Sequence, residues 1–388
     1  MADLTRRGML ASAGAAVWCW PRPDRGPLPS PGSRFRLDET PPGDERPFFA
    51  SSFIDHDPAL PYVHCPSICE IPDGRMACAW YAGSRETDRD VAIWFSETAS
   101  LAEGAAAIRW ALPRSIVDRS TAMASLARYV DKVGNSVLFT DDSGRLWLIY
   151  VTIAVGGWSG SSLNACSSGD GGASWTGSRR LTLSPFFNIS ELVRAAPFAL
   201  DSGEIGLPIY HECLGKFPEM LWLKPEGDAL VATKSRMAGG RSLLQPAVVP
   251  LGGREAVAFL RDHSAARRLV EQRTMDGGAT WSPPVATPLP NPDASVAALR
   301  LSDGSLLVAF NNSPAHRESL GLTVSTGASG WRPVAVLDNE AGQKFAYPYL
   351  HRDRRGLVHL VYTWKMQRIR HVVMNEAWIR AQAPEPVA

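Results

Sequence analysis

Two stretches of this sequence gather charged and aromatic side chains where a strand is expected to end. The first, Trp80–Asp90, carries five charged residues directly after an apolar run, and its carboxylates are candidates for acid–base chemistry. The second, Tyr210-His211-Glu212, follows the apolar run Ile205–Ile209. Because side chains alternate along a strand, Tyr210 and Glu212 are expected on one face. Each stretch is either an exposed strand end or part of the wall of a site.

A third stretch, Gly156–Ser162, is a loop of small residues around Trp158. Its indole is either a platform on which a sugar ring stacks or an ordinary turn residue. The chain has 13 Trp, and most of them are expected to be structural.

A repeated turn indicates the elements that must position these side chains. Ser168–Trp175 and Thr274–Trp281 both read S/T-x-D-G-G-x-S/T-W. In such a turn the Asp accepts hydrogen bonds from backbone amides, the Gly pair supplies positive φ values, and the Trp anchors the turn to a sheet. Two copies of eight residues are a signal of internal repeats.

Six further turns, each followed by an apolar β-rich run, extend the repeat. The turns lie at Pro72–Gly74, Asp142–Gly144, Asp201–Gly203, Leu251–Gly253, Ser302–Gly304 and Asp353–Gly356. The runs are Met76–Tyr81, Leu146–Ile153, Ile205–Tyr210, Ala256–Leu260, Leu306–Phe310 and Leu357–Tyr362. The last four turns are spaced by roughly the length of one propeller blade. The pattern therefore predicts an all-β fold, a six-bladed β-propeller forming one domain over residues 45–380, with a first blade from about residue 45 to 100.

The N-terminus has a different character. Thr5-Arg-Arg-Gly-Met-Leu10 precedes a short apolar run, and residues up to about 30 are rich in Pro. Paired Arg before such a run indicates a twin-arginine export signal. We therefore predict a signal and linker over residues 1–30, and a periplasmic or secreted protein.

Composition excludes several classes of function. The formal net charge is +1, so a surface that binds nucleic acid is not indicated, and no later segment is long enough to span a membrane. The spacing of the 6 Cys and 8 His indicates no metal site, and no cofactor is expected. A disulfide is possible in an exported protein, but its pairing cannot be deduced.

The two repeated turns, Ser168–Trp175 and Thr274–Trp281, have the sequence pattern known as an Asp-box. Together with Arg261, Arg317 and Tyr347, they make residues 50–380 resemble the sialidase (neuraminidase) superfamily of six-bladed propellers, in particular its bacterial predicted-neuraminidase branch. This resemblance implies an exo-α-sialidase type of hydrolase that removes a terminal acidic sugar. Sialidases hold the substrate carboxylate with three Arg, whose planar guanidinium groups match a carboxylate. Arg261 and Arg317 fall at the second and third of these positions, and Tyr347 at the tyrosine nucleophile.

The resemblance also implies an acid and further contacts. The general acid of the family lies in the first-blade loop, so Asp90 or Glu86 is expected to protonate the leaving oxygen. Two positions depart from the family. His64 stands in place of the first Arg, as a weaker and pH-dependent member of the clamp, and Gln245 stands in place of the Glu base, which an amide cannot replace. Glu212 is the candidate substitute. The remaining residues expected at the substrate site are Arg85, Tyr210, His211, Trp158 and Asp293.

Two alternatives to hydrolysis remain open. A polysaccharide lyase would use the Arg pair to neutralise a uronate carboxylate, with Tyr347 and either His64 or His211 as base and acid. A carbohydrate-binding propeller without catalysis would explain the missing Arg and Glu. In every case the expected partner is a carbohydrate that carries a carboxylate.

Overall fold

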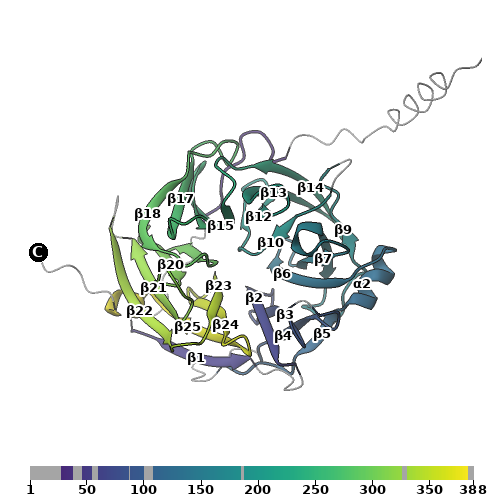
Figure 1. Cartoon of the computed structure of the whole chain (residues 1–388), viewed down its shortest axis with the longest axis horizontal. Helices are drawn as coiled ribbons and strands as arrows, with labels where there is room; N and C mark the ends of the chain where they lie inside the picture. Colours follow the sequence, from purple (N-terminus) through teal and green to yellow (C-terminus); the bar gives the residue numbers. More distant parts are fainter. Residues whose placement is uncertain are drawn as a thin grey trace, which may run out of the picture.

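Six antiparallel sheets surround a central axis as the blades of a propeller (Figure 1). The computed structural model describes residues 28–37, 46–54, 60–86, 88–99, 108–184, 188–325 and 330–382. The predicted six-bladed β-propeller is therefore confirmed. Residues 1–27, which hold the predicted export signal, lie outside the described residues.

Each blade is a sheet of four strands, with one additional short strand in the third blade. The strands are given from the axis outward. The blades are β2 (Tyr62–Glu70), β3 (Met76–Gly83), β4 (Ala92–Glu97), β5 (Arg114–Val117); β6 (Lys132–Thr140), β7 (Leu146–Ile153), β8 (Ser161–Ser168), β9 (Arg179–Arg180); β10 (Leu192–Val193), β12 (Ile205–His211), β13 (Phe217–Glu226), β14 (Ala229–Arg236), with β11 (Phe198–Ala199) beside β12; β15 (Leu243–Gly252), β16 (Glu255–Asp262), β17 (Arg268–Thr274), β18 (Val285–Pro290); β19 (Ala297–Arg300), β20 (Leu306–Phe310), β21 (Ser319–Ser325), β22 (Trp331–Asn339); and β23 (Phe345–Arg352), β24 (Val358–Trp364), β25 (Arg368–Met374), β1 (Phe49–Ile54).

The six predicted apolar runs form the second strand of each blade. β3 and β7, for example, are buried along their whole length, because each blade packs between two others and both faces of its sheet are covered. Such strands read as continuous apolar runs rather than as an alternating pattern. The turns before them join the first strand of each blade to the second.

The ring closes differently from the sequence prediction. β1 pairs with β25, with Phe49 opposite Met374, so the N-terminal strand completes the last blade instead of opening the first. The first blade accordingly begins at Tyr62. A strand pattern reveals where strands are but not which distant edge each strand covers, and an unpaired sheet edge favours such a partner.

The two Asp-box turns join the third and fourth strands of blades 2 and 4. Asp170 Oδ1 accepts from the amide of Ser174 at 2.9 Å, and Asp276 Oδ1 accepts from that of Thr280 at 2.9 Å. Gly172 has a φ of 95°, and a Cβ there would lie 2.4 Å from the ring of Phe95 in the preceding blade. The turn therefore also packs one blade against its neighbour.

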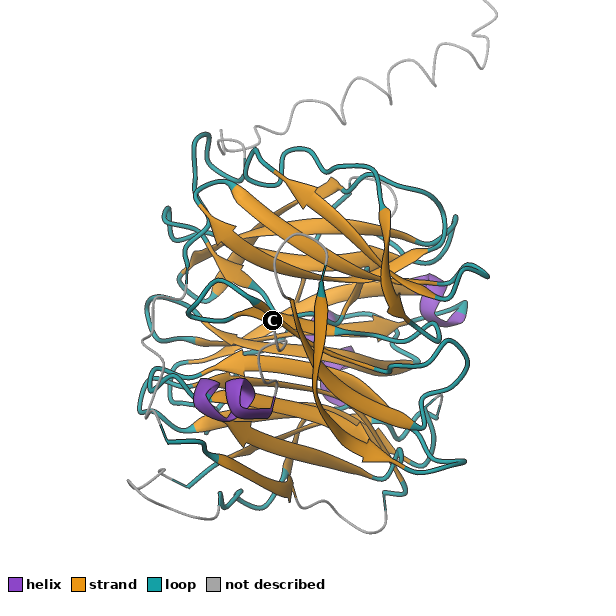
Figure 2. Cartoon of the chain, turned by 90° about the vertical axis from the view of Figure 1, so that its left-hand side faces the viewer, coloured by secondary structure: helices purple, strands orange, loops and turns teal. Residues whose placement is uncertain are grey.

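Within the described residues the helices are short. α2 (Arg119–Leu126) begins at Asp118, whose side chain accepts from the amide of Thr121; the others described are α3 (Glu376–Gln382) and the 3-10 turn η1 (Gly157–Gly160). In Figure 2 the strands run across the view, and loops gather at both sides. Within the described segments, no helix has the length and apolarity needed to cross a membrane.

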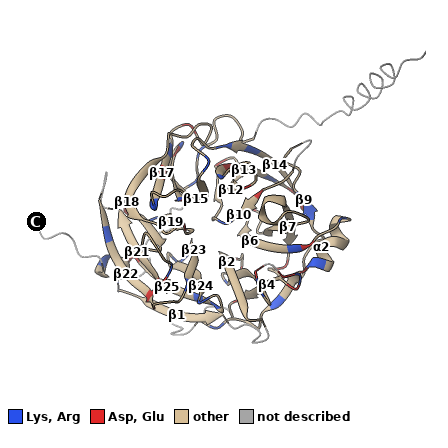
Figure 3. Cartoon of the chain, in the orientation of Figure 1, with Lys and Arg blue, Asp and Glu red and all other residues tan. Residues whose placement is uncertain are grey.

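Acidic and basic segments are interspersed around the ring (Figure 3). This distribution agrees with the net charge of +1. No single-sign field covers a whole face of the described structure, so individual side chains at the axis determine the local electrostatics.

Candidate active site

The innermost strands all run in the same direction along the axis, and the candidate site lies at the end where they begin. At or just before these starts, five non-glycine residues adopt a left-handed backbone, with φ between 50° and 61°: Cys65, Ser190, Gln245, Asp293 and Tyr347. This conformation costs on the order of 1–3 kcal/mol per residue and concentrates at functional sites. The repeated strain marks this end of the channel as the candidate site.

Three of these residues share one local device. A β-bulge interrupts β2, β15 and β23 near their starts, and Cys65, Gln245 and Tyr347 are each followed by Pro. The proline lacks an amide hydrogen and so cannot complete the ladder, while the bulge redirects the side chain before it. The bulges at Gln245 and Tyr347 bring these side chains to the axis.

Tyr347 lies at the centre of the site. The ring of His64 packs edge-on against it, with ring centroids 4.4 Å apart. The guanidinium carbons of Arg194 and Arg317 lie 5.2 Å and 5.9 Å from the centre of its ring. Burial alone would lower the pKa of Arg261. Attraction to Tyr347, and then to Asp293, raises that pKa instead. Three cations therefore surround one phenol.

Asp293 organises the two arginines that the sequence assigned to the carboxylate clamp. Its Oδ1 accepts from Arg261 Nε at 2.5 Å, and its backbone oxygen accepts from Arg317 Nη2 at 2.5 Å. His263 Nδ1 lies 2.7 Å from Oδ2. Burial alone would raise the pKa of Asp293, but the bonds and charges of Arg261 and His263 lower it. Asp293 thus holds both guanidinium groups rather than contacting a substrate as an acid.

Gln245 is fixed in one orientation by its neighbours. Arg261 Nη1 donates to Gln245 Oε1 at 3.2 Å, so the amide nitrogen of Gln245 faces Tyr210 and donates to its hydroxyl at 3.1 Å. Asn135 Nδ2 donates to the same hydroxyl at 3.2 Å. Burial first, and then the charges of Tyr347 and Glu212, raise the pKa of Tyr210 well above its usual value, so Tyr210 stays a neutral phenol.

His64 is an uncharged member of the site. It is buried, and its Nδ1 lies 3.0 Å from Thr363 Oγ1. Burial, followed by the charges of Arg194 and Arg317, holds the pKa of His64 well below its ordinary value. The positive, pH-dependent clamp that the sequence suggested for this position does not suit these surroundings, because the imidazole would have to be protonated beside two cations.

The first-blade loop places its two candidate acids differently. Glu86 Oε1 lies 3.5 Å from the hydroxyl of Tyr81, and Glu86 also raises the pKa of Tyr62, after the larger effect of burial. Tyr62 and Tyr81 both pack against His64, so Glu86 belongs to the aromatic wall of the site. Asp90 instead accepts from the amide and hydroxyl of Ser84 at 3.0 and 2.5 Å, within the exposed loop.

The remaining predicted residues lie at the margin of the site or outside it. The side chain of Arg85 is 83% exposed and lies 3.9 Å from Asp88. His211 points to the opposite face of β12 from Tyr210 and stacks on Phe217 at 4.5 Å, as the alternation of side chains predicts. Glu212 faces the Tyr210 side and lies 4.0 Å from Lys216 Nζ.

Trp158 forms the rim at blade 2. A Cβ on Gly134 would lie 2.7 Å from the Trp158 indole, so the ring lies directly over the start of β6. Gly134 precedes Asn135, the partner of Tyr210. Trp158 is half-buried and packs against the hydrophobic core.

Two important residues were not identified from the sequence. Asn135 lies in a bulge of β6 that corresponds to the bulges at Gln245 and Tyr347, so comparison of the repeats would have indicated it. Arg194 is buried and donates to the backbone oxygens of Pro66, at 3.2 Å, and of Tyr347 and Pro348, the last at 2.9 Å. It reaches from blade 3 across the axis to blades 1 and 6, and no sequence pattern predicts such a contact.

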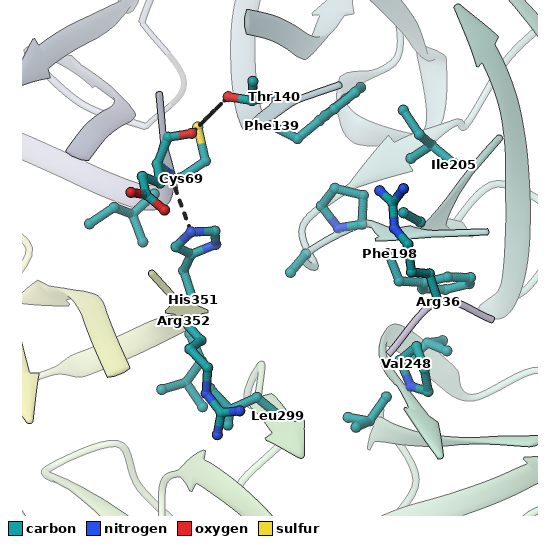
Figure 4. Close-up of a pocket in the computed structure, with 18 of the residues that line it drawn as sticks. Arg36, Cys69, Phe139, Thr140, Phe198, Ile205, Val248, Leu299, His351 and Arg352 are labelled. Atoms are coloured by element: carbon teal, nitrogen blue, oxygen red, sulfur yellow. Dashed lines mark hydrogen bonds between the residues drawn. The ribbon is translucent and has the colours of Figure 1, made fainter. Parts of the chain in front are cut away.

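A cavity of the described structure lies away from Tyr347. It measures about 560 Å³ and opens at the other end of the channel, where the innermost strands finish (Figure 4). In the described part of the chain, no group of three or more His, Cys, Asp or Glu side chains is arranged to hold a metal ion, and the five described cysteines are free thiols.

The BNR repeat-like domain matches residues 74–360. The chain belongs to the BNR repeat-like family. A comparison with curated proteins gives no match. Among solved structures, this BNR repeat-like protein is similar to a protein of unknown function from Dyadobacter fermentans, with 16% identity, a TM-score of 0.66, and coverage of 84% of this chain and 97% of the other.

Sialidases are also among the similar structures. A Hadza microbial sialidase is 14% identical with a TM-score of 0.67, covering 82% of this chain and 66% of the other. The intramolecular trans-sialidase from Ruminococcus gnavus, solved with oseltamivir carboxylate, is 12% identical with a TM-score of 0.62, covering 84% and 96%. At these identities the likeness shows a shared propeller fold, and the function of this BNR repeat-like protein must be inferred from its site.

Proposed function

We propose that this protein is a sialidase-like glycoside hydrolase that removes a terminal acidic sugar from a glycoconjugate or polysaccharide. The observation that carries the proposal is the position of Tyr347 among Arg194, Arg261 and Arg317. Arg194 is bonded to backbone oxygens, which leaves Arg261 and Arg317 to bind a ligand. Their orientation is fixed by Asp293, so little entropy is lost when a carboxylate binds.

In this proposal Tyr347 attacks the anomeric carbon while the bond to the leaving oxygen breaks. A phenol avoids the repulsion that a carboxylate nucleophile would meet beside the carboxylate of the sugar. Glu86 gives its proton to the leaving oxygen and later takes one from the water that releases the sugar from Tyr347. Glu86 is favoured over Asp90 because it contacts the aromatic wall of the site, whereas Asp90 is bonded to Ser84.

The proton of Tyr347 needs an acceptor other than Gln245, whose amide is bonded at both ends. Glu212 is the proposed acceptor. After burial, Glu212 and Tyr347 both raise the pKa of Tyr210, so both are close enough to the same phenol to influence it. Without a carboxylate at position 245 this transfer is slow, so the enzyme is expected to turn over slowly. Gln245→Glu should therefore raise the rate of hydrolysis.

Elimination is the second candidate reaction, and one contact favours it. A neutral His64 packed against Tyr347 at 4.4 Å is an acid–base pair that needs no glutamate. With these protonation states the roles are the reverse of those expected from the sequence: the neutral imidazole of His64 would take the proton next to a uronate carboxylate, and Tyr347 would give its phenolic proton to the leaving oxygen as the double bond forms. His211, the other candidate, stacks on Phe217 on the opposite face of its strand.

The deciding experiment is release of the aryl group from an aryl α-sialoside by the purified protein. Tyr347→Phe should abolish release, and Arg317→Ala should lower kcat/KM by about 10- to 100-fold, the value of one charge-assisted hydrogen bond. Arg179→Ala, which removes an exposed arginine paired with Asp228, is the matched control.

Three other outcomes would contradict hydrolysis or the role of Tyr347 in it. No release, together with a new double-bond absorbance from a uronate polysaccharide, would replace hydrolysis by elimination. Binding of a carboxylated sugar without any turnover would indicate a carbohydrate-binding propeller. Release that survives in Tyr347→Phe would refute the assignment of Tyr347.

We also propose that the protein is exported. The support is the twin Arg6-Arg7 before an apolar run. Fractionation of cells that express the full chain tests this, because a mature protein that stays in the cytoplasm would contradict it.

A further inference from the structure

A cavity of about 560 Å³ occupies the end of the channel opposite to Tyr347. The last residues of β2, β6, β15, β19 and β23 line it, together with Ile205 and the segment Pro197–Ala199 of blade 3. Every blade of the ring therefore contributes to its wall. Its volume lies within the range of pockets that bind small organic molecules, roughly 300–1,000 Å³.

Arg194 separates this cavity from the candidate active site. Its side chain crosses the axis and bonds to the backbone oxygens of Pro66 and Pro348. A small void of about 10 Å³, lined by residues such as Ala195, Ala247 and Ala297, lies along the same strands. The Arg194 crossing therefore lies between the cavity and Tyr347.

Polar and apolar groups contribute about equally to the surface of the cavity. Figure 4 shows the apolar side chains of Phe139, Ile205, Phe198, Val248 and Leu299 around its open centre. This part of the wall can accommodate the apolar portion of a ligand that also carries a charged group.

The charged groups at the cavity offer hydrogen-bond donors rather than acceptors. The rim carboxylates are already engaged: Glu70 accepts from the amide of Arg354 at 2.9 Å, and Asp142 pairs with Arg36 at 2.6 Å. Arg300 also lines the cavity, and the described residues provide it with no carboxylate partner. A guanidinium that has no carboxylate partner attracts an anion.

His351, at the end of the neighbouring strand β23, also lines the cavity. Its Nε2 accepts from the amide of Glu70 at 3.2 Å. Arg352 lies beside it in Figure 4, with its charge balanced by Glu376. The unpaired charge at the cavity is therefore that of Arg300.

We propose that this cavity is a second binding site, for an organic anion with an apolar body such as an aryl or alkyl carboxylate or sulfonate. The anion pairs with Arg300, and the body fills the apolar space between β6, β15 and β19. This site is distinct from that of the proposed hydrolysis, because it lies at the opposite end of the innermost strands and Arg194 crosses the axis between the two.

Binding of anilinonaphthalene sulfonate, followed by its fluorescence, tests the proposal on the intact protein. We expect one saturable site. Arg300→Gln should weaken binding by about 10-fold or more, the value of one charge-assisted hydrogen bond. Ala298→Phe, which adds a ring to the cavity wall, should weaken it independently of charge.

Two controls keep the result specific. Arg179→Gln removes an equal charge from an outer strand, and Arg317→Ala alters the Tyr347 end; neither should change the affinity. The proposal is overturned if binding is not saturable, if Arg300→Gln and Ala298→Phe bind as the wild type does, or if Arg317→Ala weakens binding as much as Arg300→Gln.

Discussion

Glu191 provides a quantitative test of the electrostatics of blade 3. It is fully buried just before β10, and Lys234 Nζ lies 3.6 Å from its carboxylate and 3.5 Å from that of Glu219. One ammonium group thus serves two buried acids. Burial, assisted by the charge of Glu219 and opposed by that of Lys234, raises the pKa of Glu191 from 4.5 to about 7.

The sign of the effect on stability follows from that direction. Between pH 4.5 and pH 7 the folded protein holds the Glu191 proton more tightly than the unfolded chain does, so this group favours folding below pH 4.5. Its contribution is lost as pH rises through 7. The difference between the pKa of Glu191 in the unfolded chain and in the folded protein corresponds to about 3 kcal/mol of stability, because a shift of one pKa unit corresponds to about 1.4 kcal/mol.

Glu191→Gln should abolish this dependence. The amide keeps the shape of the protonated acid, so variant and wild type should have similar unfolding free energies near pH 5. At pH 8 the variant should be more stable by up to about 3 kcal/mol. Urea unfolding at a series of pH values measures the difference directly.

Glu219→Gln is the companion variant. It removes a charge that raises the pKa of Glu191, so the decline of stability should begin at a lower pH. If the difference between Glu191→Gln and the wild type stayed constant from pH 5 to pH 8, the electrostatic reasoning would be refuted.

Two further variants test contacts near the axis. Gly134→Ala places a Cβ 2.7 Å from the Trp158 indole. It should lower the free energy of unfolding by about 1–3 kcal/mol and shift the tryptophan fluorescence. Gly177→Ala, whose Cβ would have its nearest atom at 3.7 Å, should do neither. Arg194→Met leaves the backbone oxygens that Arg194 binds without a partner and should lower the unfolding free energy by about 3–5 kcal/mol. A loss below 1 kcal/mol in urea unfolding would contradict the role of Arg194 as the central crosslink.

The repeated bulges explain how one propeller concentrates function at one end. Left-handed residues at the starts of the innermost strands turn side chains such as Gln245 and Tyr347 toward the axis. The strain is tolerated because pairing with the second strand of the blade holds the backbone before and after each bulge. The far ends of the same strands surround the second cavity.

Local patterns were sufficient to predict the architecture. The Gly pairs and aspartates of the Asp-box turns, such as Asp170 and Asp276, satisfy their own backbones, so their geometry is encoded within eight residues. The apolar runs after each turn predicted the second strand of every blade. Alternation along β12 correctly separated His211 from Tyr210. These features depend on neighbours in sequence.

The chemistry of the site depended on distant contacts. Sequence alone could not assign β1 to the last blade, place Arg194 across the axis, direct Asp90 toward Ser84 rather than toward Tyr347, or make His64 neutral. The sequence by itself determined the number of blades and the chemistry of their turns, because both follow from short-range periodicity and backbone hydrogen bonding. Only the tertiary structure decided which side chains meet at Tyr347 and which of them carry charge, because burial and charge depend on residues up to hundreds of positions away in the chain.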